Sequence, residues 1–212
     1  MDIINEYYED GKTLKFKKWY IKGKTDKDSL LKQEEYYING SVKSQQYYKE
    51  GGFYKDFDEP ATITYHENGQ IKGQHWYQNG FNHRDNNPAC IYYNEDGKIT
   101  SQEWYQNNEQ HRDNEPAVIN YYQDGTISSQ GWYKNGKLHR DNKFALEQYN
   151  KDGTVFNQLW YKEGVNYIPK KEVKSIEIMT DVHKSQEQQY FDNKCPHCKC
   201  DIKITYAIMK KD

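Results

Sequence analysis

The sequence predicts an all-β fold: an elongated, twisted, single-layer antiparallel sheet of about six tandem β-hairpin repeats, followed by a small cysteine-rich appendage. Three observations predict it. Tryptophans recur every 28 residues, glycines recur with the same period, and the segments between them are rich in β-forming residues without a helical period. We assign residues 1–168 to the repeat array and residues 169–212 to the appendage.

Composition supports a thin sheet rather than a globule with a deep core. Only 34% of the residues are hydrophobic, yet 16% are aromatic, which is high for a disordered chain. Broad amphipathic rings cover surface that a deep core would otherwise bury. With a net charge of −2, the sequence lacks the excess of basic residues that is typical of a protein that binds duplex nucleic acid. We interpret the cluster Lys15, Lys17 and Lys18 as a solvated strand edge; a basic binding face is the alternative.

The tryptophans set the register of the repeat. All five share it, at positions Trp19, Trp76, Trp104, Trp132 and Trp160. Tyr47 fills the one empty slot, and a tyrosine follows the aromatic residue in every case. The sequence therefore contains six units.

Glycines mark two chain reversals per unit. Eleven of the 14 glycines fall at two fixed positions, namely Gly11, Gly40, Gly69, Gly97, Gly125 and Gly153, and Gly23, Gly51, Gly80, Gly136 and Gly164. Asn108 takes the missing place, because asparagine tolerates left-handed backbone angles better than other non-glycine residues. Each unit is thus predicted to be one hairpin with a connecting loop, for example strand 89–93, turn 94–97 and strand 98–105, with Trp104 on one strand face.

A charged tripeptide recurs in the connecting loops of three units, as His83-Arg84-Asp85, His111-Arg112-Asp113 and His139-Arg140-Asp141. Protein kinases carry His-Arg-Asp in their catalytic loop, but three tandem copies without the other kinase motifs argue against that function. We expect the arginine and aspartate to form bidentate pairs that join neighbouring units, and the histidine to bond a loop backbone. Contact with a ligand is the alternative.

The repeat resembles a known family. Tyr77-Gln78-Asn79-Gly80-Phe81-Asn82-His83 and the segment 133–139 look like the aromatic-x-Asn-Gly-x-x-His core of MORN repeats. The longer Trp-Tyr-x-Asn-Gly-x-x-His-Arg-Asp-Asn pattern is most similar to MORN-like repeat proteins of giant DNA viruses, and also to bacterial MORN-variant antitoxin-type proteins. The resemblance covers about residues 3–164.

The resemblance implies a curved sheet of hairpins that serves protein association or membrane juxtaposition without catalysis. The 28-residue period is longer than the usual MORN unit, and Arg-Asp replaces the Gly-x-Gly that normally follows the histidine. These departures put a transfer of the family's suggested lipid contacts in doubt.

The appendage carries a different motif, Cys195-Pro196-His197-Cys198-Lys199-Cys200. Two thiolates separated by two residues fit adjacent corners of a zinc tetrahedron, as in half of a zinc ribbon or knuckle. Cys200 is the candidate third ligand, and His183 or His197 the fourth, for a structural Zn²⁺. The alternatives are a metal-free thiol cluster and a half-site completed by a second chain. We assign the remaining cysteine, Cys90, to core packing.

These features favour a non-catalytic scaffold with a protein partner, which could be a viral structural protein or a viral protein that interacts with the host. The alternatives are a lipid-surface module, a nucleic-acid-associated zinc-knuckle protein and, least supported, an enzyme. Without an apolar span or a secretory leader, we expect a cytoplasmic protein, in the host cytoplasm or the virion if viral.

Overall fold

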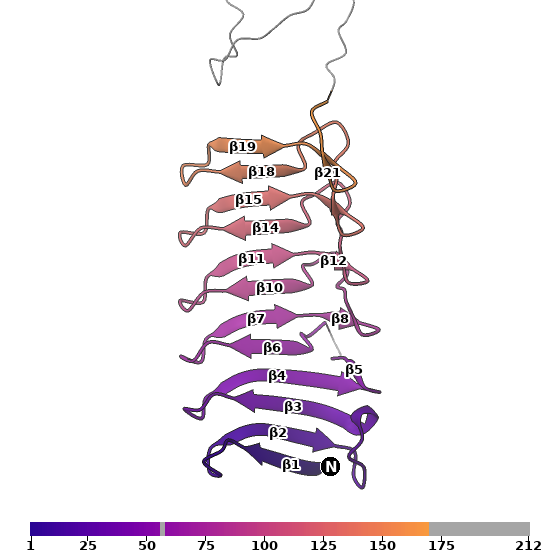
Figure 1. The fold of residues 1–212 in the computed structure, drawn as a ribbon, viewed down its shortest axis with the longest axis vertical. Coiled ribbons are helices and arrows are strands. Elements are labelled where there is room, and N and C mark those ends of the chain that lie inside the picture. Colours follow the sequence, from indigo (N-terminus) through magenta and orange to yellow (C-terminus); the bar gives the residue numbers. More distant parts are fainter. Residues whose placement is uncertain (56–57, 170–212) are drawn as a thin grey trace, which may run out of the picture. The chain divides into compact units, whose positions relative to one another are not determined.

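The structure, a computed structural model, describes residues 1–55 and 58–169. It confirms the all-β class and the tandem hairpins, with one long antiparallel sheet of 13 strands (Figure 1). Six long hairpins follow one another in chain order: β1 (Asp2–Tyr7) with β2 (Leu14–Tyr20), β3 (Leu30–Tyr36) with β4 (Val42–Lys49), β6 (Thr62–Tyr65) with β7 (Ile71–His75), β10 (Cys90–Tyr93) with β11 (Ile99–Glu103), β14 (Val118–Tyr121) with β15 (Ile127–Gly131), and β18 (Leu146–Tyr149) with β19 (Val155–Leu159).

Each long hairpin turns at the first glycine series. In the β10–β11 turn, the Gly97 amide donates to the Asn94 carbonyl (3.0 Å) and the Asn94 amide donates to the Lys98 carbonyl (2.9 Å). Gly97 has a φ of 76°, and the β10–β11 register shifts before the turn, between Tyr92 and Tyr93. This is the three-residue hairpin loop whose last residue is left-handed, so glycine is needed there.

The connecting loops contain a second hairpin, which corrects the prediction of one hairpin per unit. These short hairpins consist of two-residue strands, apart from the first, where β5 (Gly52–Phe53) pairs with the end of β4. The others are β8 (Tyr77–Gln78) with β9 (Phe81–Asn82), β12 (Tyr105–Gln106) with β13 (Glu109–Gln110), β16 (Tyr133–Lys134) with β17 (Lys137–Leu138), and β20 (Tyr161–Lys162) with β21 (Val165–Asn166).

The second glycine series closes these short hairpins. In the β8–β9 turn, Asn79 and Gly80 have φ values of 52° and 79°, as a type I′ turn requires. Asn107 and Asn108 take φ values of 52° and 67° in the next unit. The prediction that Asn108 replaces a glycine in the left-handed region is therefore confirmed.

Between β2 and β3 a short 3-10 helix, η1 (Lys27–Ser29), replaces the short hairpin. The Asp26 side chain caps it by accepting from the Ser29 amide (3.0 Å). Across residues 1–55 and 58–169, no helix has the length and apolar character to cross a bilayer.

From Trp76 onward, the tryptophan of each unit lies at the corner between the long and the short hairpin, whereas Trp19 lies within β2. Trp104 belongs to neither β11 nor β12, which corrects its prediction as a strand residue. Its amide donates to Ala117 of the next unit (2.8 Å), and its carbonyl accepts from the His111 amide (3.0 Å). The same backbone pattern recurs at Trp76 and Trp132. The corner therefore joins the two hairpins of one unit and also ties that unit to the next.

Small residues form the most deeply buried row beside these corners. Ala61, Ala89, Ala117 and Ala145 are at most 1% exposed, because the sheet brings backbone from neighbouring units close together there. Cys90 is 2% exposed, which confirms its assignment to core packing. Burial raises the pKa of the Cys90 thiol to about 12.

The sequence interpretation placed Lys15, Lys17 and Lys18 at a solvated strand edge, and the structure corrects it. Their strand, β2, is hydrogen-bonded to β1 on one side and β3 on the other. Lys17 lies over the Trp19 ring (5.1 Å to its centroid), whereas Lys18 pairs with Glu6. Successive strand residues point to opposite faces, so the cluster is split between the two faces of the sheet.

Candidate functional site

The arginine of the recurring tripeptide stacks on the tryptophan eight residues before it. The guanidinium carbon lies 4.0 Å from the ring centroid for Arg84 on Trp76, 4.0 Å for Arg112 on Trp104, and 3.8 Å for Arg140 on Trp132. Each arginine also donates to the carbonyl four residues later, at Pro88, Pro116 or Phe144. Stacking and hydrogen bonding together hold the guanidinium flat against the corner.

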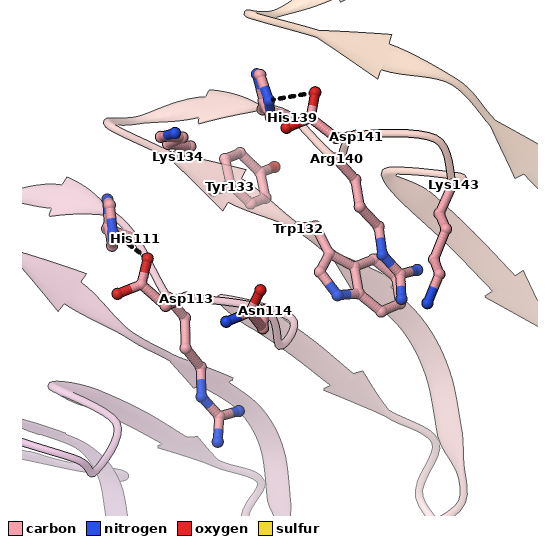
Figure 2. Close-up of a pocket in the computed structure, with 11 residues that line it drawn as sticks. His111, Asp113, Asn114, Trp132, Tyr133, Lys134, His139, Arg140, Asp141 and Lys143 are labelled. Atoms are coloured by element: carbon pink, nitrogen blue, oxygen red, sulfur yellow. Dashed lines mark hydrogen bonds and ion pairs between the residues drawn. The ribbon is translucent and has the colours of Figure 1, made fainter.

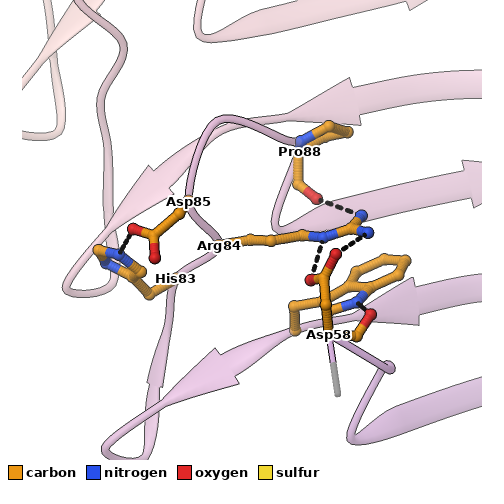
Figure 3. Close-up of polar contacts among 6 residues, drawn as sticks. Asp58, His83, Arg84, Asp85 and Pro88 are labelled. Atoms are coloured by element: carbon orange, nitrogen blue, oxygen red, sulfur yellow. Dashed lines mark hydrogen bonds and ion pairs between the residues drawn. The ribbon is translucent and has the colours of Figure 1, made fainter.

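The aspartate of the tripeptide does not meet its arginine, which corrects the expected Arg–Asp pairing. Asp85 Oδ1 lies 3.1 Å from His83 Nε2 within the same loop, and the equivalent distance is 3.4 Å in the other two loops (Figure 3). The asparagine that follows, for instance Asn86 with a φ of 60°, turns the backbone into the left-handed region. In Figure 3 the side chains of Arg84 and Asp85, adjacent in the chain, point in different directions.

The histidines link neighbouring units through the backbone, as expected, in two of the three loops. His111 Nδ1 accepts from the Asn135 amide of the next unit (3.3 Å), and His139 Nδ1 accepts from the Glu163 amide (3.2 Å). The other ring nitrogen, Nε2, lies 3.4 Å from the aspartate of the same loop in both cases. For His83 the structure shows the contact with Asp85 but a buried Nδ1 without a partner among the described residues.

The carboxylate that does meet the arginine differs from loop to loop. Arg84 makes a bidentate pair with Asp58 of the preceding loop, with Nε and Nη2 at 2.7 and 2.8 Å from its two oxygens (Figure 3). This contact joins two units, as a bidentate pair was expected to do, but through Asp58. Arg112 pairs instead with Glu115 in its own loop. For Arg140 the nearest carboxylate oxygen is that of Glu147, at 3.8 Å.

Three hollows of the same construction lie between successive loops. We call them the first, second and third hollow, with volumes of about 410, 390 and 310 Å³. Each is lined by the tripeptide of its own unit, the preceding loop, and the Trp-Tyr pair that starts the short hairpin; Figure 2 shows the third hollow. The tryptophans at their walls are Trp76, Trp104 and Trp132. Aromatic faces beside fixed charges suit binding of a polar chain.

Tyrosines on the main sheet form a second repeated feature, which the sequence interpretation missed. The hydroxyl of Tyr93 donates to Gln74 Oε1 (2.8 Å) in the preceding unit, and Tyr121 donates in the same way to Gln102 (2.6 Å). A third tie runs to the next unit, where the Tyr122 hydroxyl donates to the Tyr149 carbonyl (2.7 Å). The sequence carried a signal for these bonds, namely a constant spacing of 19 residues between the tyrosine donor and the glutamine acceptor.

The candidate zinc ligands Cys195, Cys198, Cys200, His197 and His183 lie outside the described residues. Within residues 1–55 and 58–169, no group of three or more histidine, cysteine or acidic side chains is arranged to hold a metal ion. The zinc site and the boundary between residues 168 and 169 therefore stay predictions.

Trp160, the last tryptophan, has a different environment from the other three. Its ring packs against Phe144 (4.7 Å between centroids) and Tyr167 (6.0 Å), and Ile168 stands where the three units before it have arginine. It therefore builds no arginine stack.

In comparisons with known proteins, the chain matches no protein-family model and no curated protein.

Proposed function

We propose that the chain is a non-catalytic scaffold that binds an extended segment of a protein partner along its three hollows. The observation that carries the proposal is their repetition: three hollows with the same arginine–tryptophan wall recur at one-unit steps. Tryptophan, tyrosine and arginine are also the residue types that contribute most to protein–protein binding energy.

The step between hollows fits an extended chain. Each unit adds two strands to the main sheet, so neighbouring hollows are about 9.6 Å apart at a strand spacing of ~4.8 Å. Three residues of a polyproline II segment advance about 9.3 Å, and every third side chain then faces the same way. A partner segment with a three-residue pattern can place one side chain in each hollow.

The resemblance to MORN-like repeats supports the same proposal, since it implies protein association by a hairpin sheet. A structural role in a viral particle is one form of this scaffold function.

Partner capture with blocked hollows tests the proposal. Gln78, Gln106 and Lys134 are exposed, occupy the same place in successive units and line the three hollows. Replacing all three with tryptophan fills the hollows without removing a hydrogen bond that holds the loops. The matched control places tryptophan at exposed Glu67, Glu95 and Gln123, in the turns at the other end of the long hairpins.

Tagged wild-type chain and both triple variants are used to capture partners from the native cells. We expect one stoichiometric protein with the wild type and the control, and its loss with the blocked hollows. Retention by all three chains would refute binding at the hollows. Elution of lipid or nucleic acid alone would refute the scaffold function and favour the corresponding alternative.

A further inference from the structure

We infer that the third hollow binds a carboxylate side chain of an acidic peptide. This deepens the proposed function and rests on it, because it names the chemistry of one hollow in the row. The third hollow lies between the loop at 111–114 and the loop at 139–143, with Trp132 and Tyr133 in its wall (Figure 2).

The third hollow differs from the other two in charge. Its lining has four cationic side chains and two carboxylates, whereas the first and second hollows each have two cationic side chains and three carboxylates. The four cations are Arg112, Lys134, Arg140 and Lys143. Both carboxylates are already engaged, since Asp113 lies beside His111 and Asp141 beside His139. The surplus of positive charge therefore favours an anion.

One register position accounts for much of the difference. Glu115 and Lys143 occupy the same place in successive loops, three residues after the arginine. Glu115 neutralises Arg112, but Lys143 adds a second cation beside Arg140, whose nearest carboxylate oxygen is 3.8 Å away. In the described part of the chain, the ammonium groups of Lys143 and Lys134 have no hydrogen-bond or ion-pair partner.

An unpaired buried donor marks the same place. Trp132 is 7% exposed, and its indole Nε1–H has no acceptor among the described residues. The equivalent group of Trp76 donates to the Asp58 carbonyl (2.9 Å), whereas that of Trp104, in the second hollow, likewise has no acceptor among the described residues. In Figure 2 the indole nitrogen of Trp132 faces the Asn114 side of the hollow. A buried N–H without a partner costs free energy, which an incoming oxygen would recover.

A carboxylate meets both requirements. It offers two oxygens that only accept, so one can take the indole N–H while the other takes an ammonium or guanidinium donor. The hollow, at about 310 Å³, has room for an aspartate or glutamate side chain with part of its backbone. The second hollow shares the unpaired indole, at Trp104, but Glu115 neutralises Arg112 there, and in the first hollow Asp58 pairs with Arg84. Only the third hollow combines the unpaired donor with a surplus of positive charge. We therefore expect an acidic residue in the partner at the position that reaches the third hollow.

The test uses the full chain and a glutamate octapeptide, with a glutamine octapeptide as the neutral probe. Binding is followed by fluorescence anisotropy and by ¹⁵N–¹H spectra of the tryptophan indoles, with the Trp132 signal assigned from Trp132→Phe. Lys143→Glu gives this position the glutamate that Glu115 supplies in the second hollow. The matched control is Lys24→Glu, the same change at an exposed lysine in the loop before η1. Lys134→Glu is the second variant within the hollow.

We expect saturable binding of the glutamate peptide only, with a downfield shift of the Trp132 indole proton. Lys143→Glu and Lys134→Glu should each weaken binding about tenfold, as reversal of an exposed charge predicts, while Lys24→Glu leaves it unchanged. Absence of binding, equal weakening by Lys24→Glu, or an unmoved Trp132 signal would each overturn the inference. A failed capture experiment would remove the scaffold proposal without altering this titration, so the two failures are distinguishable.

Discussion

Substitution of Arg84 and its two partners distinguishes the ring stack from the ion pair as the interaction that holds the corner. The guanidinium lies 4.0 Å from the Trp76 ring centroid and makes two hydrogen bonds to Asp58. The arginine side chain is only 17% exposed, but that of Asp58 is 57% exposed. Solvent screens the ion pair, which we therefore expect to contribute about 0.2–1 kcal/mol. The stack should contribute about 1–2 kcal/mol, because the ring is buried.

Urea denaturation measures the two contributions. Asp58→Asn should lower the free energy of unfolding by about 0.5 kcal/mol, as expected for an exposed pair. Arg84→Ala should lower it by roughly 2–3 kcal/mol, because the stack and the packing of the alkyl stem are lost as well. Arg84→Lys should be nearly as costly as alanine, since an ammonium supplies neither the planar stack nor the bidentate fork. A cost for Asp58→Asn equal to that of Arg84→Ala would refute this reasoning.

The pH dependence gives an independent check on the same pair. The hydrogen bonds from Arg84 lower the pKa of Asp58 below its usual value. A carboxylate with a lowered folded-state pKa stabilises the protein above its unfolded-state pKa and loses that contribution as the pH falls through the folded-state value. The difference in stability between wild type and Asp58→Asn should therefore vanish in acid, while the cost of Arg84→Ala should largely persist.

Three further outcomes follow from the structure. Cys90 should resist alkylation at pH 8 in the folded chain and react in urea, because burial raises its pKa to about 12; peptide mass spectrometry reads both states. In thermal denaturation, Asn79→Gly should change the free energy of unfolding by a few tenths of a kcal/mol. Asn79→Val should lower it by about 1–2 kcal/mol, because a β-branched residue is strained at a φ of 52°. Gly131→Ala should lower the free energy of unfolding in urea by about 1–3 kcal/mol, since the new Cβ would lie 2.7 Å from Tyr133 Cε2. A urea midpoint equal to that of the wild type would contradict the observed packing.

Long-range periodicity made the main sheet predictable. The constant spacing of the tryptophans and glycines placed the six long hairpins, and it identified Asn108 as a left-handed turn residue. The short hairpins were not recognised, because strands of two residues such as Tyr77–Gln78 are too short to show alternation. For the same reason the Trp104 corner looked like the continuation of a strand.

The site was only partly predictable, because its contacts depend on how the loop folds. The arginine–tryptophan stack was visible as a constant eight-residue spacing, which Tyr47 and Lys55 share with a distance of 3.7 Å to the ring centroid. The choice of carboxylate was not visible. Asp85 contacts His83 in its own loop, and the bidentate partner of Arg84 comes from 26 residues earlier in the chain.

The corner tryptophans couple folding to binding. Trp132 helps to join one unit to the next through its backbone, carries Arg140 on its ring, and forms a wall of the third hollow. Truncating such a residue removes the hollow and weakens the array together, so loss of binding alone would not reveal its role. Exposed lining residues such as Lys143 escape this coupling, because the Lys143 ammonium has no hydrogen-bond or ion-pair partner within residues 1–55 and 58–169. The residues that set the charge of a hollow are therefore different from those that hold the repeat together. The charge can vary from unit to unit while the fold stays the same, as Glu115 and Lys143 illustrate.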